Sequence, residues 1–357
     1  MLIYRPCYTT REAVKRALDM RLTARNDWQV DDAIQAGSEA ADKFLHRVFY
    51  PQIDTRYVDW PNWQGSYPWR VWLDGAELAD VTVNVPVVTS GGNVIPNSQI
   101  FWGSPRYTPP YTYFELNQAS SATFGQGNTP QRDIAIAATY GYWIQSAPAD
   151  MLAGSVSTTS ATSITVTGAC TAAVGVGDNI LIGTERMLVT DKQMADTGQA
   201  QQSGLTTANT ADVALGVGNG ADYAAGEILQ LDAEQVLVTS IAGKTLTVIR
   251  SWNGTPIAAH TGAEIYGLRT LIVQRAALGT AAATYADGTS IAVHVSPRLV
   301  SQLSRAHAID QVMQELGAYA RTQGSGPAKQ GQIGQNIPGL AQRCYDAYAR
   351  SGRSRTV

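Results

Sequence analysis

Two stretches of this chain share one pattern: GDNILIGTERMLVT at residues 177–190 and GEILQLDAEQVLVT at residues 226–239. The copies are offset by 49 residues and are identical at 5 of 14 positions. Each copy has the alternation of a strand, then a polar turn carrying Glu185 or Glu234, then a second strand. The second copy continues into another strand-turn-strand pattern, LTVIRSWNGTPIAAHTGAEIY, at residues 246–266. A repeated β unit of this kind predicts a small barrel or sandwich.

Helical and strand patterns occur on both sides of this repeat, so we expect the β unit to be an insertion in a host domain. The Thr9–Glu12 segment fits a capping box at a helix start. Residues 195–209 are rich in Gln, Thr and Ala and are expected to be disordered. Helices are expected over 9–22, 31–48, 297–322 and 340–350, and strands over 69–73, 81–88, 111–116 and 133–143.

The predicted fold class is α+β: a helical host domain with a small antiparallel sheet, plus an inserted all-β barrel or sandwich. The expected parts are residues 1–153 (host), 154–277 (inserted β domain with its repeat), 278–323 (long host helix) and 324–357 (extended C-terminal arm).

Charged residues make up only 15% of the 357-residue chain, and the net charge is -3. Residues 297–357 hold 8 basic and 3 acidic side chains, whereas residues 154–277 hold 6 basic and 10 acidic ones. The three cysteines have no metal-ligand spacing, which argues against a zinc site and a disulfide framework. The N-terminal segment lacks a signal-peptide layout, and no apolar run is long enough for a membrane span, so no membrane association is expected.

Residue patterns typical of catalysis are not found. The four histidines, His46, His260, His294 and His307, lack metal-ligand spacing, and His260 is expected to fix its turn through a backbone hydrogen bond. Glu185 and Glu234 could be read as paired acid–base carboxylates, but repeated units place equivalent polar residues at equivalent turns for folding reasons. We therefore predict no enzyme activity, no catalytic or metal-binding residues and no cofactor.

Aromatic residues crowd the region between residues 60 and 113. Such a cluster suits a protein core or a subunit interface, and the few basic residues nearby disfavour nucleic-acid stacking. The candidates for a subunit interface are Trp60, Trp63, Trp69, Trp72, Tyr111 and Tyr113.

Three stretches resemble the head–tail adaptor (connector, or head-completion) proteins of tailed bacteriophages. They are AIQAGSEAADKFLHRVFYPQIDTRYVDWP (residues 33–61), IAIAATYGYWIQSAPADM (residues 134–151) and LGAYARTQGSGPAK (residues 316–329). The repeated β unit is similar to a module that recurs in phage structural proteins. Simple adaptors are smaller than this chain, which carries an extra β domain between its last host strand and its last long helix.

The resemblance implies a virion protein of the phage neck, assembled in the host cytoplasm. It implies a homo-oligomeric ring, commonly twelvefold, that lies below the portal and surrounds a DNA channel without sequence-specific contacts. Its partners would be the portal protein, a stopper or tail-completion protein, and the DNA in the channel. The candidate portal-docking residues in the C-terminal arm are Lys329, Arg343, Tyr345, Tyr348, Arg350, Arg353 and Arg355.

Two alternatives remain open at this stage. The chain could be another virion protein, such as a tail or baseplate subunit, which uses the same β module. An extracellular carbohydrate-binding protein or hydrolase would need a signal sequence and two carboxylates that face an aromatic cleft.

Overall fold

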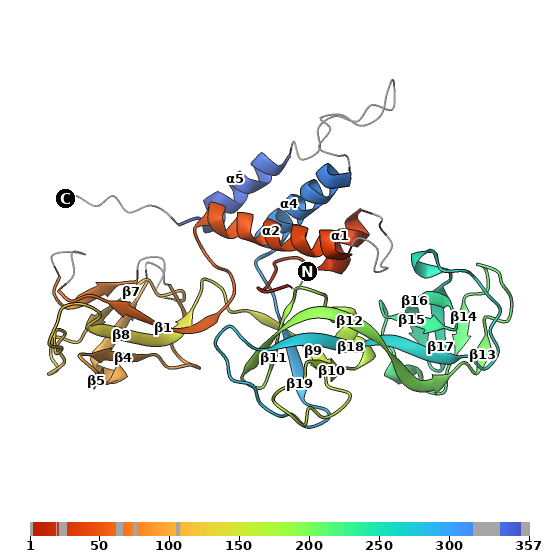
Figure 1. The fold of residues 1–357 in the computed structure, drawn as a ribbon, viewed down its shortest axis with the longest axis horizontal. Coiled ribbons are helices and arrows are strands. Elements are labelled where there is room, and N and C mark those ends of the chain that lie inside the picture. Colours follow the sequence, from red (N-terminus) through yellow and green to blue (C-terminus); the bar gives the residue numbers. More distant parts are fainter. Residues whose placement is uncertain are drawn as a thin grey trace, which may run out of the picture.

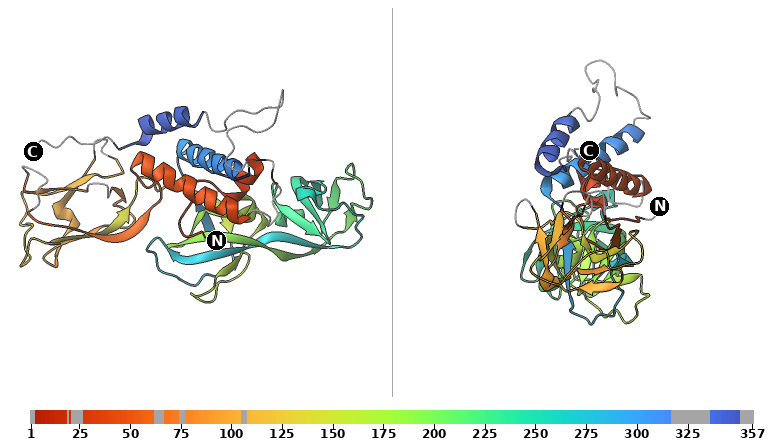
Figure 2. Two further views of the ribbon diagram at one scale, coloured as in Figure 1. Left: turned by 45° about the horizontal axis from the view of Figure 1, so that its top comes forward. Right: turned by 90° about the vertical axis from the view of Figure 1, so that its left-hand side faces the viewer.

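The computed structural model describes residues 3–18, 20, 27–61, 67–73, 77–104, 108–316 and 336–350. Three β-rich lobes lie in a row, and a layer of helices lies on one side of the row, over its middle (Figures 1 and 2). We call the lobes the sheet lobe (residues 52–140), module A (residues 146–195 and 266–294) and module B (residues 196–265).

The protein is mostly β-sheet, with 36% strand against 23% helix, so the expected helical host domain is wrong. The reason lies in the sheet lobe. This segment forms its own core around Leu78, Phe114, Ile134 and Ile136, all of which are at most 1% exposed. A segment with its own buried core is a separate lobe rather than a small sheet that completes a helical domain.

The sheet lobe contains two antiparallel sheets. The larger has the order β1-β8-β4-β5, with β3 also paired to β8, and the smaller has the order β2-β7-β6. The elements are β1 (Gln52–Val58), β2 (Arg70–Trp72), β3 (Leu78–Asp80), β4 (Val87–Ser90), β5 (Asn93–Ile95), the short helix η1 (Asn97–Gln99), β6 (Ile100–Gly103), β7 (Tyr113–Leu116) and β8 (Ile134–Tyr140).

The strand expected over residues 81–88 is wrong for most of its length. The carboxylate of Asp80 accepts hydrogen bonds from the backbone N–H groups of Thr82, Val83 and Asn84, which bends the chain, and strand β4 begins at Val87. Asx-type bonding of this kind competes with strand pairing. Val83 is consequently 83% exposed.

Modules A and B share one continuous 11-stranded sheet. Within it, module A has the strand order β9-β19-β11-β12-β18-β10 and module B has the order β12-β18-β15-β16-β17-β14. Numbered along the chain within each module, both orders read 1-6-3-4-5-2. The strands are β9 (Ser146–Met151), β10 (Ser163–Thr165), β11 (Asn179–Ile182), β12 (Glu185–Ala200), β13 (Ser203–Gly204), β14 (Ala214–Gly216), β15 (Ile228–Leu231), β16 (Glu234–Ala242), β17 (Thr245–Ile249), β18 (Glu264–Ala277) and β19 (Ser290–His294).

Module B is therefore a second copy of module A that is inserted within module A. The insertion separates the fourth and fifth strands of module A, and the long strands β12 and β18 run through both modules as one antiparallel pair. The equivalent apolar residues lie in separate cores: Ile180 and Met187 in module A, and Leu229 and Val236 in module B. Each copy can thus bury its own hydrophobic face.

The disorder expected over residues 195–209 is wrong in part. Strand β12 continues to Ala200 because its partner β18 supplies hydrogen bonds as far as Glu264. A polar composition does not prevent strand formation where a long neighbouring strand is available for pairing. The short helices of the modules are α3 (Gly168–Ala173), η2 (Gly220–Asp222) and η3 (Trp252–Gly254).

The helical layer comprises α1 (Arg11–Ala17), α2 (Asp27–Leu45), α4 (Arg298–Leu316) and α5 (Ile337–Tyr348). Helices α2 and α4 approach closely at Gly37, where a Cβ atom would lie 2.5 Å from the carbonyl oxygen of Ser304. Beside it, the buried hydroxyls of Ser38 and Ser304 lie 3.0 Å apart. Small residues at this crossing permit the short distance between the helices.

One expectation about the N-terminal helix needs correction. The N-cap of α1 is Thr10, which accepts from the N–H of Ala13, while Glu12 instead accepts from the N–H of Val176 in module A. The helix expected over 340–350, within the C-terminal arm, is present as α5, which packs on α2 and α4 and buries Cys344 completely. The helices that the structure describes include none long and apolar enough to cross a membrane.

Candidate functional site

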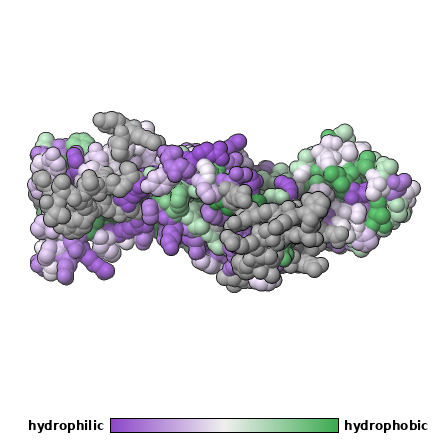
Figure 3. Space-filling view, turned by 90° about the horizontal axis from the view of Figure 1, so that it is seen from above, coloured by the Kyte–Doolittle hydropathy of each residue, from purple (hydrophilic) through white to green (hydrophobic). Residues whose placement is uncertain are grey.

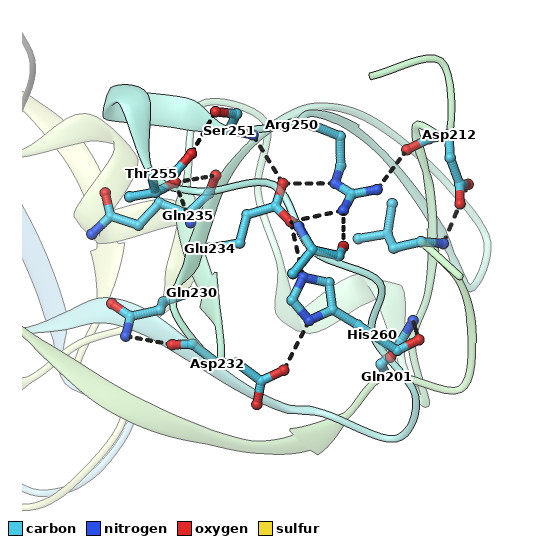
Figure 4. Close-up of polar contacts among 12 residues, drawn as sticks. Gln201, Asp212, Gln230, Asp232, Glu234, Gln235, Arg250, Ser251, Thr255 and His260 are labelled. Atoms are coloured by element: carbon cyan, nitrogen blue, oxygen red, sulfur yellow. Dashed lines mark hydrogen bonds and ion pairs between the residues drawn. The ribbon is translucent and has the colours of Figure 1, made fainter. Parts of the chain in front are cut away.

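The densest cluster of buried charged groups surrounds Glu234 in module B (Figure 4). Both carboxylate oxygens bind Arg250, whose Nε and Nη2 donate at 2.7 Å each. The backbone N–H groups of Ser251 and Ala258 donate at 2.9 and 3.1 Å, and Nε2 of His260 lies 2.9 Å from Oε2. Burial alone would raise the pKa of Glu234, but Arg250 and these donors hold the pKa at about 2. The carboxylate is therefore ionised and fully engaged at neutral pH.

Glu185 in module A has the same surroundings. Nε and Nη2 of Arg275 donate to it at 2.7 Å each, and the N–H groups of Ala276 and Ala283 donate at 2.9 and 3.0 Å. The hydroxyl of Tyr285 donates at 3.1 Å, in the place that His260 takes in module B. Although burial opposes it, Arg275 and these donors lower the pKa of Glu185 as well.

Each arginine also ties together two further segments of its module. Nη1 of Arg250 donates to the carbonyl oxygens of Thr207 and Asp212 at 3.2 and 3.3 Å. Nη1 of Arg275 donates to those of Thr158 and Ala161 at 3.2 and 3.3 Å. We call the repeated arrangement, Glu234 with Arg250 and Glu185 with Arg275, the glutamate–arginine lock.

The lock explains why the repeat conserves a glutamate at each turn. The second half of this repeat, which comprises each arginine and the residues after it, was not identified from the sequence. The signal was present: Arg250, Gly254 and Thr255 recur 25 residues later as Arg275, Gly279 and Thr280. The residue after each arginine, Ser251 or Ala276, has a φ of 54° or 52° in the left-handed region, which turns its N–H toward the carboxylate.

The two copies of the lock differ in one partner of the glutamate, which is His260 in module B and Tyr285 in module A. His260 is buried, and its Nδ1 lies 2.9 Å from a carboxylate oxygen of Asp232, an exposed residue at the turn before Glu234. The equivalent of Asp232 in module A is Gly183. The expectation that His260 acts through a backbone bond is incomplete: its N–H does donate to the carbonyl of Leu205, but the ring binds two carboxylates.

This geometry does not suit acid–base catalysis. Glu185 and Glu234 lie in different cores, each is 0% exposed, and each already binds an arginine. A general base must reach the proton that it removes, and neither carboxylate has an oxygen free for that contact. Within the described ranges, no group of three or more His, Cys, Asp or Glu side chains could hold a metal ion.

A second pair of equivalent carboxylates is less symmetric. Asp178 in module A is partly buried, and its carboxylate accepts a hydrogen bond from the N–H of Gly175 at 2.7 Å. Desolvation raises its pKa to about 7. Its equivalent Glu227 in module B binds Nε of Arg269 at 2.7 Å. Among the described residues, Asp178 forms no such ion pair. Asp178, at the contact of module A with the helical layer, thus lacks an arginine partner, whereas Glu227 in module B pairs with Arg269 on the shared strand β18.

A cavity of about 380 Å³ lies between α1, α3 and the loop at Gly226. Charged residues of both signs line it, and several of them pair with one another: Arg11 with Asp27 and Asp191, and Lys192 with Glu12. The charges are thus mutually compensated, and we assign no ligand to this cavity.

Of the other histidines, His294 contacts the backbone. Nε2 of His294 lies 2.7 Å from the carbonyl oxygen of Phe49, and burial lowers its pKa to about 4. His307 is half-buried on α4, whereas His46 lies just beyond the end of α2.

The aromatic interface candidates belong largely to the packing of the sheet lobe itself. Trp60, Trp69 and Tyr111 pack against its core, and the rings of Trp72 and Tyr113 lie 4.7 Å apart. All five are half-buried. The sixth candidate, Trp63, lies outside the described residues.

The portal-docking candidates are divided. Arg343 is exposed and Tyr345 is 41% exposed on α5, whereas Tyr348 packs edge-to-face on Phe49 inside the helical layer. Arg350 is half-buried, and its N–H donates to the carbonyl of Leu45. Lys329, Arg353 and Arg355 lie outside the described residues.

No protein-family model, curated protein or solved structure matches this chain.

Proposed function

We propose that this chain is a non-enzymatic structural subunit of a tailed-bacteriophage virion that serves as a head–tail adaptor. In this role it forms a homo-oligomeric ring below the portal and around the DNA channel, and it also contacts a stopper or tail-completion protein. The resemblance of residues 33–61, 134–151 and 316–329 to adaptor proteins motivates the proposal.

The glutamate–arginine lock is the observation that supports the proposal most. The cluster with the strongest chemical signal in the chain occurs twice, with the same partners, and in both places it holds backbone segments together. Perturbed carboxylates often mark catalytic sites, but structural ion-pair networks shift pKa values too. A duplicated lock favours a protein whose work is assembly.

Docking to the portal is assigned to the exposed side of α5. Arg343 and Tyr345 project from it, whereas Tyr348 and Cys344 belong to the core of the helical layer. Arginine and tyrosine are enriched at protein interfaces, which suits this assignment.

Negative-stain imaging of the full chain, alone and mixed with the portal protein, tests the proposal. We expect rings that add to the portal, and we expect Arg343→Glu to weaken that addition. Lys43→Glu, which also changes an exposed basic residue of the helical layer, is the matched control. A chain that forms no ring and does not bind the portal would overturn the proposal.

The predominance of β-structure favours a second candidate, a tail or baseplate subunit. Gold-labelled antibodies against the chain distinguish the two on intact particles. Label at the neck supports the adaptor, and label along the tail or at its tip supports the alternative.

A further inference from the structure

Strand register shows which residues of the two modules are equivalent. In module B, Leu229 on β15 pairs with Gly267 on β18. In module A, Ile180 on β11 pairs with Val293 on β19, and Ile180 is completely buried, like Leu229. In an antiparallel pair, the residue two positions before one partner faces the residue two positions after the other. These positions hold a glutamate and an arginine in module B, but an aspartate and a valine in module A.

The two acidic residues, Glu227 and Asp178, are held in the same kind of turn. Oε2 of Glu227 accepts from the N–H of Ala224 at 3.2 Å, and Oδ2 of Asp178 accepts from the N–H of Gly175 at 2.7 Å. The backbone N–H of each acidic residue donates to the carbonyl oxygen of that same partner at 3.2 Å. Module A thus reproduces both the carboxylate and the turn around it.

The arginine is the part that module A does not reproduce. Nε of Arg269 donates to Glu227 at 2.7 Å, and its Nη2 donates to the carbonyl oxygen of Asp222 at 2.7 Å. The residue in the place of Arg269 is Val295, which is 42% exposed. A valine side chain offers a carboxylate no hydrogen bond.

A cavity of about 390 Å³ lies at this place in module A. Asp178 and Val295 line it, and so does Ala173, which is the equivalent of Asp222. The three positions that surround the guanidinium of module B therefore surround a cavity in module A.

The charges near this cavity leave Asp178 without a counter-ion. The carboxylate of Glu12 and the ammonium of Lys192 act on Asp178, and desolvation raises its pKa to about 7. Lys192 already donates to two carbonyl oxygens in and just after α3. Arg298 and Arg305 also line the cavity, but both are exposed on α4, and neither forms an ion pair with Asp178 in the part of the chain that the structure describes.

We propose that this cavity binds the guanidinium of an arginine side chain from another protein chain, with Asp178 as its counter-ion. Module B supplies the template, because there an arginine of the same chain bonds the equivalent carboxylate and a carbonyl oxygen together. A planar guanidinium can make both bonds at once, whereas an ammonium is a point charge. A desolvated carboxylate without a counter-ion costs stability, and local departures of this kind occur at functional sites. The binding goes beyond the proposed function, because it requires neither a ring nor a portal.

Two small probes, N-acetyl-arginine amide and N-acetyl-lysine amide, test the site in the full chain. Hydrogen exchange of peptides from residues 168–182 reports its occupancy. We expect the arginine probe to increase protection and the lysine probe to have no effect. Asp178→Asn should weaken the response at least about tenfold, because it removes the charged acceptor. Asp287→Asn, which changes an exposed acidic residue of module A, is the matched control and should leave the response unchanged.

The affinity for the arginine probe should depend on pH. A carboxyl group with a pKa of about 7 is mostly protonated at pH 6 and mostly ionised at pH 8, and a guanidinium binds the ionised form. We therefore expect binding to be about tenfold tighter at pH 8 than at pH 6.

A graft gives an independent readout. Val295→Arg supplies the arginine from the same chain, as module B does, and Val295→Gln is the uncharged control at the same partly exposed position. We expect Val295→Arg to abolish the response to the arginine probe and, at pH 8, to protect residues 168–182 more than Val295→Gln does. Adding Asp178→Asn to Val295→Arg should remove that gain.

Equal responses to the two probes, or no response to either, would overturn the proposal. An unchanged response in Asp178→Asn would overturn it as well, as would a Val295→Arg chain that behaves like Val295→Gln. Portal binding is measured separately, so failure of the adaptor function is distinguishable from failure of the arginine site.

Discussion

The glutamate–arginine lock of module B makes a quantitative prediction. Glu234→Gln keeps the shape of the side chain but removes its charge, which leaves the guanidinium of Arg250 buried at 0% exposure without a counter-ion. Breaking one side of a buried ion pair costs about 3–5 kcal/mol. Because a domain is stable by only about 5–15 kcal/mol in total, module B should open locally in a substantial fraction of molecules.

Hydrogen exchange read by mass spectrometry locates the effect. Peptides from residues 205–260 should lose protection in Glu234→Gln, whereas peptides from β8 in the sheet lobe should not change, because they belong to a separate core. Glu264→Gln is the matched control, since Glu264 is exposed and belongs to the same module.

A double variant separates loss of the pair from loss of packing. Glu234→Leu combined with Arg250→Met replaces both charges with apolar groups, which is often neutral or stabilising for a buried pair. We expect it to recover only part of the protection that Glu234→Gln loses, because the N–H groups of Ser251 and Ala258 are left without their acceptor. Unchanged protection in Glu234→Gln, or equal loss in the sheet lobe, would refute the reasoning about the lock.

Three further predictions concern the carboxylates and the insertion. Asp178→Asn should raise the melting temperature more at pH 8 than at pH 5, because the cost of this carboxylate to stability grows as the pH rises from the unfolded value of about 3.8 to the folded pKa of about 7. Glu227→Gln, at the equivalent position beside Arg269, should lower the melting temperature, and equal responses would contradict the assignment. Glu234, with its pKa depressed to about 2, stabilises module B above the unfolded value of about 4.5 and loses that contribution as the pH falls toward 2, so exchange protection of 205–260 should decline over that range; a flat profile would contradict the depressed pKa. Replacing residues 197–265 with Asn-Gly should leave module A folded, because Asp196 and Tyr266 are paired across β12 and β18 and an Asn-Gly turn can close such a pair. Aggregation, or loss of β-structure measured by circular dichroism, would show that module A needs its insert.

The repeat made part of this fold predictable. The alternation in 177–190 and 226–239 predicts two strands and a turn in each copy, and the structure has β11 and β12 in one and β15 and β16 in the other. The helix expected over 31–48 is present as α2, shifted toward the N-terminus. Local periodicity is sufficient for such elements because their buried faces follow directly from residue spacing.

Features that depend on distant residues were missed. The fifth strand of module A follows its fourth only after the whole of module B, so the repeat looked tandem although it is nested. Glu185 binds Arg275 and Tyr285, which lie 90 and 100 residues further along the chain. The helix expected over 340–350 is present as α5, but its packing on α2 and α4 could not be read from its own composition.

The distribution of hydrophobic residues on the surface also depends on residues that are distant in the sequence. Seen from the side of the helical layer, hydrophilic residues dominate the middle of the molecule, whereas hydrophobic ones gather on module B (Figure 3). The exposed apolar side chains on the larger sheet of the sheet lobe could not be foreseen as one surface, because Ile53, Tyr57, Val87 and Val94 come from three separate strands. Their alignment depends on register, which a single sequence does not specify.

The shared strands β12 and β18 have a mechanical consequence. A domain joined to its neighbour through loops can swing freely, but module B is joined to module A by two paired strands, so any rotation must strain a hydrogen-bonded ribbon. Register shifts between Gln193 and Ala195 and between Asp196 and Ala200 interrupt this ribbon near the junction of the two modules, and such irregularities bend and twist a strand pair. Module B therefore projects from module A on two paired strands. A force on the far end of module B is transmitted to module A, against which the helical layer packs.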